Sequence, residues 1–130
     1  MITYLKVRKD RLVGDIQEDF NSAFPFLKIE FYKKTGSTDR HPIDKAIPLA
    51  KVGILQEGVL RIDDDMSVGE LEHIFSDQYG TYVQVSRKSG SLWLETTMTD
   101  KWTLRQQNEH GRELSVPENR NLPGNEMGYA

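Results

Sequence analysis

The residues that could do chemistry in this 130-residue sequence are few, and none forms a recognised catalytic motif. There are no cysteines, which excludes disulfides and thiolate metal sites. The histidines, His41, His73 and His110, lack metal-ligand spacing, and no serine stands in a Gly-x-Ser-x-Gly turn. The sequence therefore predicts no catalytic, cofactor-binding or metal-binding residues.

Two short segments invite an ion-binding interpretation. Asp63-Asp64-Asp65 offers carboxylates to Mg²⁺ or Ca²⁺, but it lacks the alternating acids and the glycine of an EF-hand loop. Acidic residues before a helix also favour its dipole, and we expect that simpler role. Lys33-Lys34-Thr35-Gly36-Ser37 contains the residues of a phosphate-binding loop, but the Walker pattern needs glycine before lysine at the entry of a helix. This segment follows a predicted strand, so we expect a turn.

Two stretches of the chain, residues 13–37 and 68–91, are similar to each other. Val13-Gly14-Asp15-Ile16 aligns with Val68-Gly69-Glu70-Leu71, and Phe20 aligns with Phe75. The basic turn at 33–37 aligns with Arg87-Lys88-Ser89-Gly90-Ser91. Because apolar positions, glycines and the basic turn agree together, the pattern indicates an internal duplication.

Each copy predicts a strand, a helix and a second strand. Alternating apolar residues mark strands at 4–8, 27–32, 59–63 and 81–88. Apolar residues at helical spacing mark helices at 13–24 and 68–79. Pro25 ends the first helix, whereas Ser67 with Glu70 forms a capping box for the second and Gly80 ends it.

The rest of the chain predicts weaker elements. Strands at 92–97 and 101–106 would extend strand 81–88 into a meander. Residues 47–52 predict at best a short edge strand, because Pro48 lacks a backbone donor. From Asn108 onward the polar residues predict a tail without a core face.

This order of elements predicts an α+β fold. The expected architecture is a ferredoxin-like two-layer sandwich of duplicated βαβ units, with a mainly antiparallel sheet, two helices on one face and an added C-terminal β-meander. The alternative is a sheet in which each helix is followed by its own meander. Residues 1–115 would form one domain, with repeat units at about 4–37 and 59–91, a meander at 81–106 and a polar tail at 116–130. The predicted core contains Val13, Ile16, Phe20, Ile29, Phe31, Leu71, Phe75, Val83 and Val85.

Residues 82–97 read YVQVSRKSGSLWLETT. Together with Asp100, Trp102-Thr103-Leu104 and Gln107-Asn108, they resemble a group of small uncharacterised bacterial proteins. The segment Phe24-Pro25-Phe26-Leu27-Lys28 resembles the same group. The resemblance spans most of residues 5–113. It implies a cytoplasmic bacterial protein and carries no activity or site with it.

Charge and hydropathy narrow the classes of function. The net charge is −3. Residues 1–51 carry ten Lys/Arg against seven Asp/Glu, or +3, and residues 52–130 carry seven against thirteen, or −6. This asymmetry is either ordinary surface variation or a bipolar surface suited to self-association. Overall acidity makes nucleic-acid binding unlikely. The sequence begins without a signal-peptide pattern and contains no apolar run long enough to span a membrane, which predicts a cytoplasmic location.

We therefore expect a non-catalytic binding or interaction domain, with a homodimer or another protein as partner and no cofactor. The alternatives are a small enzyme with a cleft at the repeat junction and a nucleic-acid binder that uses the two basic turns. Strand alternation places Trp93 opposite Leu92 and Leu94, so it would face outward unless the tail or the loop between the repeats covers it. The expected interaction surface comprises Tyr82, Trp93, Lys33, Lys34, Arg87 and Lys88.

Overall fold

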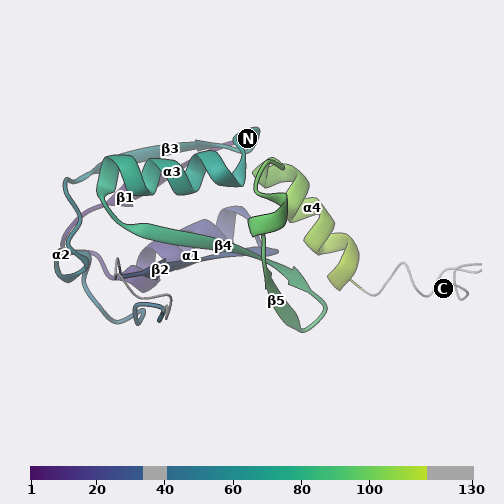
Figure 1. The fold of residues 1–130 in the computed structure, drawn as a ribbon, viewed down its shortest axis with the longest axis horizontal. Helices are drawn as coiled ribbons and strands as arrows, with labels where there is room; N and C mark the ends of the chain where they lie inside the picture. The colour runs from purple at the N-terminus through teal and green to yellow at the C-terminus, as the bar shows by residue number, and fades with distance from the viewer. Residues whose placement is uncertain (34–40, 117–130) are drawn as a thin grey trace, which may run out of the picture.

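The computed structural model describes residues 1–33 and 41–116, which form an α+β fold with two antiparallel sheets. The first sheet pairs β1 (Ile2–Val7) with β3 (Gly58–Asp63), and the second has the order β2 (Leu27–Tyr32), β4 (Tyr82–Ser89), β5 (Leu92–Glu95). The helices are α1 (Val13–Ala23), α2 (Leu49–Val52), α3 (Val68–Tyr79) and α4 (Leu104–Ser115), with a short 3₁₀ turn, η1, at Thr97–Thr99 (Figure 1).

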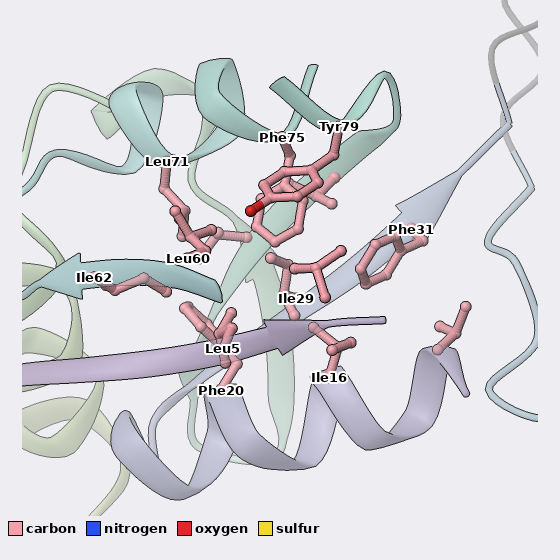
Figure 2. Close-up of a cluster of buried hydrophobic side chains, with 14 of the residues drawn as sticks. Leu5, Ile16, Phe20, Ile29, Phe31, Leu60, Ile62, Leu71, Phe75 and Tyr79 are labelled. Carbon is pink, nitrogen blue, oxygen red and sulfur yellow. The ribbon is translucent and has the colours of Figure 1, made fainter. Parts of the chain in front are cut away.

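The core lies between α1 and α3, which approach the strands from opposite sides. Figure 2 shows Ile16 and Phe20 of α1 pointing toward Leu5 of β1, while Leu71 and Phe75 of α3 enter from the other side. Every residue of the predicted core is buried, the most accessible being Val83 at 8%. The apolar periodicity of the sequence therefore identified the core correctly.

The local signals also formed where they were expected. Ser67 Oγ accepts a hydrogen bond from the backbone N–H of Glu70, whose carboxylate accepts one from the N–H of Ser67, so the capping box starts α3. Gly80 ends the helix in the left-handed region at φ 68°. The strands predicted before and after both long helices are present as β1, β2, β3 and β4.

The sheet pairing differs from the single sheet that was expected. β2 pairs with β4 in one sheet, and β1 pairs with β3 in a separate two-stranded sheet. The other edge of β2 is occupied by α1, because the Gln17 Nε2 donates to the Ile29 carbonyl (2.9 Å) and the Asn21 Nδ2 donates to the Leu27 carbonyl (2.8 Å). These side chains take acceptors that a neighbouring strand would otherwise use, so β2 remains at the edge of its own sheet.

The predicted third strand of the meander at 101–106 is wrong. Thr103 Oγ1 accepts from the backbone N–H of Gln106 (3.1 Å), and Gln106 Oε1 accepts from the N–H of Thr103 (2.9 Å). This capping box starts α4, which continues through Ser115, so only the β4–β5 hairpin remains of the meander.

Two further expectations are corrected. The short strand expected at 47–52 is replaced by α2, because Pro48 supplies an N-cap conformation and has no N–H to lose in a first turn. The chain from Asn108 to Ser115 belongs to α4 and packs on the sheet, so the tail does not begin at Asn108. The remainder of the predicted tail, residues 117–130, lies outside the described residues.

The helix starts are joined in pairs by reciprocal backbone hydrogen bonds. At α1 and α2, the N–H of Val13 donates to Ile47 O (2.9 Å) and the N–H of Leu49 donates to Arg11 O (2.8 Å). At α3 and α4, the N–H of Val68 donates to Trp102 O (3.1 Å), and the N–H of Leu104 donates to Met66 O (2.9 Å). Each pair of bonds thus fixes α1 against α2 and α3 against α4, in each case the next helix along the chain.

Candidate functional site

The β4–β5 hairpin presents a run of exposed apolar side chains. Leu92, Trp93 and Leu94 are 63%, 36% and 42% exposed, and they are consecutive on β5, the edge strand of its sheet. Three large apolar residues in a row on an edge strand are uncommon in a protein that works alone, because such an edge is a template for pairing with another chain.

Trp93 lies on the outer face of the hairpin between two lysines. It pairs with Lys88 across the strands, and the Nζ of Lys88 is 5.9 Å from the ring centroid. The Nζ of Lys28, from β2, is 5.2 Å from the same centroid. Trp93 therefore lies on the face of β5 opposite Leu92 and Leu94, as the alternation predicts, although both leucines are more exposed than the tryptophan. The ammonium groups of Lys28 and Lys88 make cation–π contacts with its ring.

The backbone of β5 is oriented for pairing at its outer edge. The N–H of Thr96 donates to Val85 O at 3.2 Å, which fixes the alternation of the β4–β5 ladder. In an antiparallel ladder every second residue pair exchanges hydrogen bonds, so Leu92 and Leu94 bond to β4. The N–H and C=O groups of Trp93 and Glu95 consequently point away from β4.

The expected interaction surface is divided between the two ends of the sheet. Tyr82 is 40% exposed and pairs with Tyr32 at the end of β2, after which Lys33 follows. Lys88 stands at the other end of β4, about 20 Å away at the rise of an extended strand. Lys34 lies outside the described residues.

Arg87 lies on the opposite face of β4 from Trp93, beneath α4. Its Nη1 donates to Gln107 Oε1 (2.7 Å), and its guanidinium lies 5.8 Å from the ring centroid of Trp102. Gln107 is fully buried and also donates to the carbonyl and hydroxyl oxygens of Thr99 at 2.7 and 2.8 Å. Arg87 therefore fastens α4 to the sheet, a role the sequence reasoning missed because α4 was not expected; the Thr103–Gln106 capping box was the available signal.

A different kind of site, a cleft, lies at the far end of the same sheet. A cleft of about 620 Å³ is bordered by Lys33, which follows β2, by residues 41–44 and Ile47, and by Lys51 and Val52 of α2. In Figure 1 this region, around α2 and the end of β2, lies away from β5 and α4.

The acidic triplet supports the fold through ion pairs. The carboxylates of Asp63, Asp64 and Asp65 lie close enough together to hold an ion. Asp64 is 8% exposed, and its Oδ1 contacts Arg105 Nη1 at 3.3 Å and the amino group of Met1 at 3.1 Å. A hydrogen bond to Asp65, together with attraction to Asp65, Asp64 and Asp63, raises the pKa of Arg105. The triplet thus ties the start of α3 to α4.

Within residues 1–33 and 41–116, no helix is long and apolar enough to cross a membrane. In comparisons with known proteins, no protein-family model, no curated protein and no solved structure matches this chain.

Proposed function

We propose that this chain is a non-catalytic interaction domain that associates with a second copy of itself through β5. The observation that carries the proposal is the exposed Leu92-Trp93-Leu94 run on an edge strand whose outer backbone groups point away from β4. A second β5 placed antiparallel would supply donors and acceptors to those groups and would bury the exposed leucines at the same time.

One register satisfies both the hydrogen bonds and the charges. When Leu94 stands opposite Leu94 of the second copy, Trp93 stands opposite Glu95 of that copy. The outward-pointing residues then pair with each other, as an antiparallel ladder requires. Glu95 of one copy also comes beside the Trp93 that carries the Lys28 and Lys88 ammonium groups of the other. The shifted register that sets Trp93 against Trp93 would place Glu95 opposite Ser91. It would also bring the lysine-flanked tryptophans of the two copies together, so like charges would face each other, and it is less favourable.

Sedimentation velocity at several concentrations tests this association. The wild-type chain should shift from monomer to dimer as concentration rises, and Trp93→Ala should remain a monomer at concentrations where the wild type is dimeric. Lys88→Glu should weaken the dimer, and Lys88→Glu combined with Glu95→Lys should restore it. Tyr82→Ala, at the far end of β4, is the matched control and should leave the dimer unchanged. A wild-type chain that stays monomeric at high concentration would refute the proposal.

We also propose that the two halves derive from a duplicated strand–helix–strand unit. The sequence alignment of 13–37 with 68–91 supports this, as do the matched reciprocal bonds at Val13 and Leu49 and at Val68 and Leu104. The resemblance to small bacterial proteins and the lack of cysteine support a place in the cytoplasm.

A further inference from the structure

The cleft at the end of β2 combines an apolar wall with a basic rim. Ile43, Ile47 and Val52 line it and pack against the core while remaining partly accessible. The exposed side chains of Lys33 and Lys51 border the same space. Its volume of about 620 Å³ is in the range of small-molecule sites. The cleft is therefore large enough for a ligand that has both an apolar and a charged part.

The described lining of the cleft carries a net positive charge. Lys33 and Lys51 make no ion pair or side-chain hydrogen bond with any described residue. The acidic residue among the described lining is Asp44, whose Oδ1 accepts a hydrogen bond from the N–H of Ala46 at 2.8 Å. That carboxylate caps its own turn and keeps its negative charge, so the two lysines leave the described lining with one net positive charge, which favours an anion from outside.

The second half of the chain shows how the corresponding cation is held. Lys33 aligns with Arg87 in the sequence, and Val52 takes the same place in α2 that Gln107 takes in α4, three residues after Leu49 and Leu104. Arg87 finds its partner in the Gln107 carbonyl at 2.7 Å. Val52 offers no acceptor, and α2 ends at once because Gly53 adopts φ 87°. The first half therefore keeps the cation and the space but lacks the group that fills them in the second half.

We infer that this cleft binds a small organic carboxylate, with an apolar body against Ile43, Ile47 and Val52 and the carboxylate between Lys33 and Lys51. The site is separate from β5 and needs no second copy of the chain. Its ligand class follows from the rim charge and the apolar wall together: a neutral apolar molecule would leave both ammonium groups without an anion, and an inorganic anion would leave the wall uncovered.

The first test uses 2-naphthoate and its uncharged analogue 2-naphthalenemethanol as probes of the full-length chain. In a ¹⁵N-edited NMR titration, 2-naphthoate should shift the amide signals of Ile43, Ile47 and Val52. The uncharged analogue should bind at least about fivefold more weakly, the effect of one unit charge at about 4 Å in water. Equal affinity for the two probes would overturn the assignment of the charge.

Variants then test the individual residues. Lys33→Gln and Lys51→Gln should each weaken the binding of 2-naphthoate by about fivefold, because each removes one unit charge from the rim. Val52→Gln adds an amide to the cleft that Val52 and Lys33 both line and reduces the space, so it should also weaken binding. Lys101→Gln removes the same charge at an exposed position in the turn before α4, outside both proposed sites, so it is the matched control and should leave the affinity unchanged.

Three results would refute the inference. One is the absence of any shift at Ile43, Ile47 and Val52 at millimolar probe. Another is a set of shifts confined to the β4–β5 hairpin, which would show that the probe stacks on Trp93 instead. A third is an equal loss of affinity in Lys101→Gln, which would mean that the overall charge of the chain attracts the probe. Each result can be read in a wild-type or surface-variant protein, and none depends on whether the chain forms the dimer proposed above.

Discussion

Gln107 should be a principal contributor to the attachment of α4, and its replacement by leucine measures that contribution. The side chain is fully buried, accepts from Arg87 Nη1 at 2.7 Å and donates to two oxygens of Thr99. Leucine has a similar size and leaves little cavity, so the cost comes from polar groups that lose their partners. A hydrogen bond to a charged group contributes about 1.5–3 kcal/mol, and an unsatisfied buried acceptor costs about 1–3 kcal/mol.

The two contributions together amount to about 2.5–6 kcal/mol. Because water can reach part of Thr99, the lower half of that range applies, and Gln107→Leu should reduce the free energy of unfolding by about 2.5–4 kcal/mol. Urea denaturation followed by circular dichroism measures this change. Glu109→Gln is the control: Glu109 pairs with Arg112 on the exposed face of α4, and its loss should cost under about 0.5 kcal/mol.

A double-mutant cycle with Arg87→Leu separates the pair from its surroundings. Removing both partners should cost less than the sum of the single changes, with a coupling of about 1–3 kcal/mol for residues in direct contact. Additive losses, or a Gln107→Leu cost no larger than that of Glu109→Gln, would refute the reasoning that this network holds α4 on the sheet.

Three other predictions concern the core and the turns. Phe75→Ala should cost about 3–5 kcal/mol in urea melts, because Phe75 is 1% exposed and packs edge-on against Phe31; a loss under about 1 kcal/mol would mean that the α3 stripe does not form the core. Gly80→Ala should lower the free energy of unfolding by about 1–2 kcal/mol, since φ is 68° there and a new Cβ would meet Leu55. Gly53 has a similar φ of 87° but open space around a new Cβ, so the difference between the losses of stability in Gly80→Ala and Gly53→Ala measures the Leu55 contact alone. Burial raises the pKa of the Tyr79 phenol in the folded protein. The stability that the neutral phenol contributes is therefore fully present below the pKa of about 10 that tyrosine has in the unfolded chain, and it is lost as the pH rises through the higher pKa of the folded state. The drop in the urea midpoint between pH 8 and pH 11 should therefore be smaller in Tyr79→Phe than in the wild type. Tyr4 is exposed, so Tyr4→Phe should show the same drop as the wild type.

The sequence by itself determined those features that depend on neighbours along the chain. The stripes of α1 and α3, the Ser67–Glu70 capping box, the Gly80 cap and the alternation of Ile29 and Phe31 were all readable, because helix and strand periods are local properties. The outward position of Trp93 followed from the same alternation. The Thr103–Gln106 capping box was equally local, but the aromatic and threonine residues around it favoured a strand, and that preference gave the wrong prediction at α4.

The tertiary structure decided which strands pair and what the polar side chains do. β2 pairs with β4 along one edge, whereas Gln17 and Asn21 of α1 bond to carbonyl groups on its other edge, and nothing in the local sequence of β2 records either contact. Lys33 and Arg87 have the same residue class and aligned positions, but one borders an open cleft and the other is held by Gln107 beneath α4. The difference arises from the lengths of α2 and α4, which lie far along the chain from those cations. A side chain's chemistry is set by what packs against it, and packing between distant segments is not encoded in any local period.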